Sequence, residues 1–148
     1  MRISAKVDYG LRALCELAAT PQQRIKADAL AASQGIPVHF LENILRELRD
    51  AGYVESMRGS EGGYRLAAGA ESVTLADVIR TLEGPLAAVR HVRPDELAFR
   101  GHAASLVEVW MAVRAQLRAV LDHVTVGDVA TGSLPEAIAH MADRQDAP

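Results

Sequence analysis

The feature that most constrains the fold is a pair of helical patterns separated by only three residues. The first pattern covers residues 27–34, with Leu30 and Ala31 on its inner face, and the second covers residues 38–51. Between them lies Gly35-Ile36-Pro37, in which glycine ends the first helix and proline is tolerated at the start of the second. Helix, short glycine turn and helix is the arrangement of a helix-turn-helix.

The second of these helices has two chemically different faces. An apolar stripe at helical spacing is expected to be buried, and it consists of Phe40, Leu41, Ile44, Leu45 and Leu48. Another face carries His39, Glu42, Asn43 and Arg46. Asn, Arg and Glu side chains can all read base edges, although the same pattern also fits an ordinary solvated helix face.

A hairpin signal follows directly. Tyr53-Val54-Glu55-Ser56 and residues 63–66 flank a tip with three glycines in five residues, from Gly59 to Gly63. Alone, this stretch fits a plain surface hairpin. After a helix-turn-helix it indicates a wing, which lies beside or within the minor groove while the recognition helix enters the major groove. Arg58 is then the predicted minor-groove or phosphate contact.

The rest of the chain is mainly helical in pattern. We expect helices at residues 4–19, 74–82, 102–124 and 126–130, a loop at 85–100, and a frayed or disordered acidic tail over the last ~13 residues. The predicted fold class is mainly α with a small β-hairpin wing, that is, a winged helix-turn-helix plus a long C-terminal dimerisation helix. The predicted units are a DNA-binding domain (1–66), a linker, connecting helix and sensing-region loop (67–100), a dimerisation helix with a short terminal helix (101–132), and the tail (133–148).

The longest helical pattern carries an apolar seam over about five turns. Its members are Leu106, Val109, Trp110, Val113, Leu117, Val120 and Leu121. A helix of this length exceeds what a small winged domain needs, so we expect the seam to pair with its copy in a second chain. Packing back onto its own domain is the alternative.

Composition and charge limit the remaining options. The chain has 148 residues and a net charge of −3, yet the acidity lies in the second half: residues 1–66 hold nine Lys/Arg against eight Asp/Glu, and residues 67–148 hold seven against eleven. No apolar run is long enough for a membrane span, so we expect a cytoplasmic protein. One cysteine, Cys15, excludes an intrachain disulfide. The five histidines lack metal-ligand spacing and no nucleophile motif is present, so we expect neither a metal site nor an enzyme.

Five motifs occur in a specific order and spacing. They are Tyr9-Gly10-Leu11-Arg12-Ala13-Leu14, Phe40-Leu41-Glu42-Asn43-Ile44-Leu45, Leu48-Arg49-Asp50-Ala51-Gly52-Tyr53-Val54, Arg58-Gly59 with Gly62-Gly63-Tyr64-Arg65-Leu66, and Leu75-Ala76-Asp77-Val78-Ile79 with Leu82-Glu83-Gly84. Together they closely resemble the Rrf2 family of bacterial transcription regulators, the IscR-, NsrR- and CymR-like repressors. The similarity is dense over residues 1–84 and continues more loosely through the long helix.

The resemblance implies a homodimeric winged-helix repressor that binds an imperfect palindrome in double-stranded DNA. The wing arginine would reach the minor groove, and Glu42 would make a sequence-discriminating base contact. The expected DNA-binding residues are Lys6, Tyr9, Val38, His39, Glu42, Asn43, Arg46, Arg58, Gly59, Ser60 and Tyr64. A winged-helix protein–protein module that signals through a partner enzyme without binding DNA is the alternative.

The sensing half departs from the family pattern. Many members hold an iron–sulphur cluster with three cysteines before and at the start of the long helix, and residues 85–106 contain none. We therefore expect no cofactor, and a signal that arrives through a partner enzyme or a small effector. Arg90, His91 and Arg93, in the loop where the cluster would sit, could hold an anion, or they are simply a solvated charged loop.

Overall fold

The helix at the centre of the fold is α1 (Ala5–Ala19), which contacts α2, α3, α4, α6 and β2. The structure, a computed structural model, describes residues 2–144; Met1 and the last four residues of the predicted tail lie outside that part. The Ser4 side chain accepts a hydrogen bond from the Val7 amide and begins α1. Gly10 lets the helices that carry Ile44 and Leu82 lie close to α1. A β-carbon at this position would be 2.6 Å from Leu82 Cδ1 and 3.3 Å from Ile44 Cγ2.

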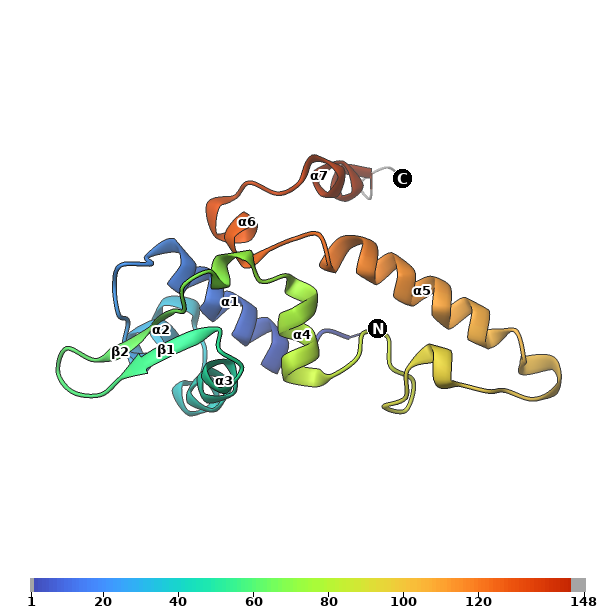
Figure 1. Cartoon of the computed structure of the whole chain (residues 1–148), viewed down its shortest axis with the longest axis horizontal. Coiled ribbons are helices and arrows are strands. Elements are labelled where there is room, and N and C mark those ends of the chain that lie inside the picture. The colour runs from blue at the N-terminus through green and yellow to red at the C-terminus, as the bar shows by residue number, and fades with distance from the viewer. Residues whose placement is uncertain (1, 145–148) are drawn as a thin grey trace.

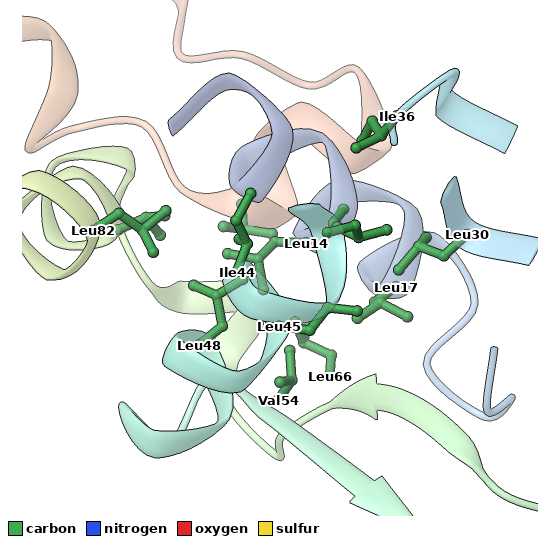
Figure 2. Packing of buried hydrophobic residues seen from close by; sticks show 14 of the residues in the cluster. Leu14, Leu17, Leu30, Ile36, Ile44, Leu45, Leu48, Val54, Leu66 and Leu82 are labelled. Carbon is green, nitrogen blue, oxygen red and sulfur yellow. The ribbon is translucent and has the colours of Figure 1, made fainter. Parts of the chain in front are cut away.

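The predicted helix-turn-helix is present as α2 (Ala27–Gln34) and α3 (Val38–Asp50). Gly35 adopts φ 64°, a left-handed conformation that suits glycine, and its amide closes the end of α2. Figure 2 shows Ile44, Leu45 and Leu48 of α3 packed with Leu14 and Leu17 of α1 in the buried core. Burial of these side chains fixes which face of α3 is turned to solvent.

The wing consists of β1 (Val54–Met57) and β2 (Gly63–Leu66), which pair antiparallel with Val54 opposite Leu66. A third segment extends this small sheet. The backbones of Ile25 and Tyr64 exchange two hydrogen bonds of 2.8 Å, so the loop before α2 pairs with the outer side of β2. The base of the wing is therefore attached to the helix-turn-helix on both sides.

The second half of the chain leaves the core and returns to it (Figure 1). Short 3₁₀ turns at 70–72, 94–96 and 101–103 punctuate the helices α4 (Leu75–Glu83), α5 (Leu106–Leu121), α6 (Val126–Thr131) and α7 (Glu136–Asp143). Backbone hydrogen bonds from Leu75 to Val124 and from Val126 to Val73 join the start of α4 to the segment after α5. As a result, α6 packs on α1, whereas α5 extends away from the winged part.

Two local expectations differ from the structure. The helix expected at 102–124 is the 16-residue α5, because residues 101–103 form a 3₁₀ turn in which Gly101 has φ 58°. The expectation of a frayed tail is wrong for residues 136–143. These residues form α7, which begins after Pro135 and has Glu136 in its first turn. The mainly α fold with a two-stranded hairpin is as predicted. None of the helices among residues 2–144 has the length and apolar character to cross a membrane.

One carboxylate joins α4 to the end of α5. Asp122 accepts hydrogen bonds of 2.8 Å from Arg118 and 2.8 Å from Arg80, and its side chain is 23% exposed. The hydrogen bond from Arg118, followed by that from Arg80, lowers the pKa of Asp122. Its ionised form therefore stabilises the folded chain.

We predict that Asp122→Asn lowers the free energy of unfolding by about 1 kcal/mol at pH 7. Because the folded-state pKa is depressed, this contribution is present above the unfolded pKa of about 3.9 and disappears as the pH falls through the folded value. Urea unfolding of the wild type and the variant at pH 7 and pH 3 measures the difference. Glu61→Gln, which changes an exposed wing residue with no ion pair to any residue in 2–144, is the control. A difference that persists unchanged at pH 3 would contradict the assignment.

Candidate DNA interface

Three elements supply the predicted DNA-binding residues: the start of α1, the outer face of α3, and the hairpin. Figure 1 shows α3 and the hairpin together at the end of the molecule opposite α5. The contacts agree, because β1 follows α3 directly and packs against it, and β2 packs against α1. A convex helix and an adjacent wing are therefore presented from one end of the fold.

The outer face of α3 gathers the four predicted reading residues. The side chain of His39 is 93% exposed and that of Glu42 is 46% exposed, while Asn43 and Arg46 are exposed as well. His39 Nδ1 lies 3.8 Å from a Glu42 oxygen, and Arg46 donates a 3.4 Å hydrogen bond to the Asn43 side chain. These side chains face solvent. A base edge could therefore bind to them in place of the long His39–Glu42 and Arg46–Asn43 contacts.

The predicted DNA-binding residues of α1, Lys6 and Tyr9, lie beside α3 and already contact other side chains. Lys6 Nζ lies 2.8 Å from Glu47 on α3, so part of its charge is already matched. The Tyr9 ring lies between Phe40, at 5.5 Å between centroids and 81° between planes, and the Arg12 guanidinium, at 5.0 Å. A phosphate near Lys6 would have to share the ammonium group with Glu47.

The tip of the wing presents Arg58, Gly59 and Ser60 to solvent. Arg58 makes no ion pair with any residue in the described range 2–144. The turn leaves no room for a larger residue at Gly62, where a β-carbon would collide with the Met57 carbonyl oxygen. The Gly62 amide donates a 3.0 Å hydrogen bond to the Gly59 carbonyl and closes the turn. Arg58 therefore lies directly before a tight, hydrogen-bonded turn.

Two predicted contacts are more embedded than the rest. Val38 and Tyr64 are half-buried and pack against the hydrophobic core, so only part of each side chain is available to a ligand. Their DNA-binding roles stay predictions. Their packing already explains why an apolar and an aromatic residue stand at these positions.

The expectation for Phe40 was wrong. The buried stripe predicted for α3 includes Phe40, yet Phe40 is 39% exposed, while Leu41, Ile44, Leu45 and Leu48 are fully buried. The reason is geometric, because Phe40 lies about 100° around the helix from Leu41 and falls at the edge of the stripe. Helical spacing alone did not distinguish the edge of the stripe from its centre.

The predicted effector loop is only partly assembled. Arg90 and His91 form the tip of a two-residue turn with φ of 52° and 65°, closed by two hydrogen bonds between Val89 and Val92. Both side chains are exposed. The Arg93 guanidinium instead forms an ion pair of 2.7 Å with the Asp95 carboxylate, which offsets the positive charge of Arg93. An anion site that uses all three residues stays a prediction.

A groove of about 1100 Å³ runs between α5 and the winged part. Seam residues of α5 form one wall, and the opposite wall comes from the start of the chain, α4 and the segment after it. No residue of α5 is buried, and Leu106 and Val109 are 39% and 49% exposed. The apolar seam is therefore exposed at Leu106 and Val109, and half-buried at its other positions, in a single chain.

Residues 3–132 match the family model described as Rrf2, iron-dependent transcriptional regulator. The chain belongs to the Rrf2 family. Rv1287 of Mycobacterium tuberculosis, named as an HTH-type transcriptional regulator, is 47% identical over 144 residues that cover 97% of this chain and 89% of the relative. CymR of Bacillus subtilis, also named as an HTH-type transcriptional regulator, is 35% identical over 142 residues that cover 95% of this chain and 98% of CymR.

Solved structures of Rrf2 proteins share the fold. The structure of CymR (YrzC), described as the global cysteine regulator of B. subtilis, has a TM-score of 0.75 and 34% identity, and covers 88% of this chain and 97% of that one. IscR of T. potens has a TM-score of 0.72 and 31% identity, with 93% and 90% covered. The predicted family and fold class are confirmed. The protein is a DNA-binding transcriptional regulator of the helix-turn-helix type, and its relatives are regulators rather than enzymes.

The donor set of this Rrf2 chain does not fit an iron–sulphur cluster. Its single cysteine, Cys15, lies on α1. Burial, followed by the nearby Glu16 carboxylate, raises the pKa of the Cys15 thiol. One cysteine supplies far fewer thiolate ligands than a cluster needs. Within residues 2–144, no three His, Cys, Asp or Glu side chains are grouped so that they could hold a metal ion.

Proposed function

We propose that this Rrf2 protein is a homodimeric, sequence-specific repressor that binds an imperfect palindrome without an iron–sulphur cluster. The observation that carries the proposal is the exposed polar face of α3 beside the arginine-bearing wing. In this proposal α3 enters the major groove, where Asn43, Arg46 and Glu42 have the hydrogen-bonding groups to read adenine, guanine and cytosine edges. The wing carries Arg58 to the backbone or the minor groove.

The uncovered seam on α5 supports the homodimer. The groove is lined mainly by apolar side chains, and it lies beside a helix without a buried residue, so a second chain could cover apolar surface there. A second copy presents the same seam, so an isologous pair of α5 helices covers both at once. Two copies also supply two reading helices, as a palindromic site requires.

Binding to DNA should depend on Arg58 and Glu42 in different ways. Arg58→Ala should weaken binding to most duplexes, because a phosphate or minor-groove contact carries little base information. Glu42→Ala should mainly alter the preferred sequence, with a discrimination cost of about 1–3 kcal/mol. Fluorescence anisotropy with duplexes selected from a random pool measures both. Arg100→Ala, an exposed arginine before α5, is the control. An unchanged preferred sequence for Glu42→Ala would show that the reading face is assigned wrongly.

The dimer can be tested at Val109, which is 49% exposed in the single chain and lines the groove. Val109→Glu should leave the helical content intact, because the side chain is not part of the buried core, and should shift the protein from dimer to monomer by placing a charge in the seam. Sedimentation velocity measures the change. Ala115→Glu adds the same charge to an exposed α5 position outside the groove and should stay dimeric. A wild-type monomer at micromolar concentration would refute the proposal.

The cluster-free state predicts a protein without visible iron–sulphur absorption after anaerobic purification and reconstitution with iron and sulphide. The physical reason is the donor set, since one half-buried thiol cannot replace several thiolate ligands. Ultraviolet–visible spectra together with iron quantification provide the measurement. Stoichiometric iron with a visible absorption band would contradict the prediction.

A further inference from the structure

The polar reading face of α3 has an apolar neighbour. Phe40 lies in the first turn of α3, directly after His39 and one turn before Asn43, with 39% of its surface exposed. The four other members of its stripe are fully buried, whereas Phe40 keeps part of its ring in solvent. Part of the Phe40 ring is therefore free to contact a ligand at the edge of the reading face.

The ring of Phe40 also packs against an aromatic side chain of α1. Tyr9 of α1 meets it edge-to-face with centroids 5.5 Å apart, and the Arg12 guanidinium lies 5.0 Å from the Tyr9 ring. Arg12 is itself fixed by hydrogen bonds of 2.9 Å to Asp8 and 2.8 Å to the Gln34 carbonyl. This stack limits the freedom of the Phe40 ring before any ligand binds, so that little entropy is lost on contact.

The major groove offers few apolar partners for such a ring. Among the edges of the four standard bases there, the C5-methyl group of thymine is the apolar one, and phenylalanine is among the side chains that contact it. The neighbouring residues on α3 are suited to hydrogen-bonding base edges and would leave this methyl group unread.

We propose that Phe40 determines sequence specificity by packing against the C5-methyl group of one thymine in each half-site. The inference rests on the proposed entry of α3 into the major groove. It assigns the Tyr9–Arg12 pair a positioning role, because these side chains hold the Phe40 ring at the edge of the reading face and are not themselves required to touch that base.

Replacement of thymine by deoxyuridine tests the contact, because it removes only the methyl group. The duplex is one that the full-length wild-type protein selects from a random pool, and each thymine is replaced in turn while binding is followed by fluorescence anisotropy. We expect one thymine per half-site at which deoxyuridine weakens wild-type binding about three- to ten-fold. For Phe40→Ala, the two duplexes should bind equally.

The controls separate a direct contact from a folding defect. Phe40→Leu retains an apolar side chain and should keep part of the discrimination, and circular dichroism reports whether each variant is folded. Arg49→Ala alters an exposed residue on the same helix and should keep the wild-type ratio between the two duplexes.

The outcomes also distinguish this inference from the proposed function. Selective DNA binding without any thymine that discriminates against deoxyuridine would overturn the role of Phe40 alone, as would full discrimination by a folded Phe40→Ala. Failure of the wild-type protein to select any sequence would overturn the proposed function together with this inference.

Discussion

The close contact of α1 with α3 and α4 at Gly10 is the constraint on which the reading surface depends. A β-carbon at this position would lie 2.6 Å from Leu82 Cδ1 and 3.3 Å from Ile44 Cγ2, so a larger residue would force the Leu82 and Ile44 side chains to shift. The approach seats one side of α3 against α1. Successive helical residues are rotated by about 100°. With one side of α3 packed against α1, His39, Asn43 and Arg46 therefore face solvent.

The outer surface of α1 reinforces the same arrangement. Lys6 pairs with Glu47 toward the end of α3, and Tyr9 meets Phe40 near its beginning. Thus α3 is held at both ends by α1 as well as along its buried side. A helix placed in this way meets a ligand as a preformed surface, and the free energy of binding is not spent on ordering it. One helix therefore serves both the core and the candidate interface.

Local signals predicted the elements well, because their causes lie within a few residues. Ser4 begins α1, Gly35 ends α2, and the glycines from 59 to 63 form the wing turn. The pairing of Ile25 with Tyr64 joins segments far apart in sequence, and no periodicity reports it. Likewise, the contact of Phe40 with Tyr9 and the pairing of Lys6 with Glu47 follow from the register between α1 and α3. These are the features of the candidate interface that the sequence left undetermined.

The cations near α3 are only partly paired with carboxylates of the same chain. The chain carries a net charge of −3, and near α3 Lys6 and Arg49 are already paired with carboxylates, whereas Arg46 and Arg58 have no carboxylate partner within residues 2–144. Of these four cations, Arg46 and Arg58 are therefore the ones left free to contact phosphates, and each such contact adds a counterion-release contribution to the affinity. In the proposed dimer the second half-site binds as an intramolecular event at high effective concentration, which multiplies two modest affinities. The same apolar seam that α5 leaves uncovered would then determine both the assembly of the protein and the strength with which it holds DNA.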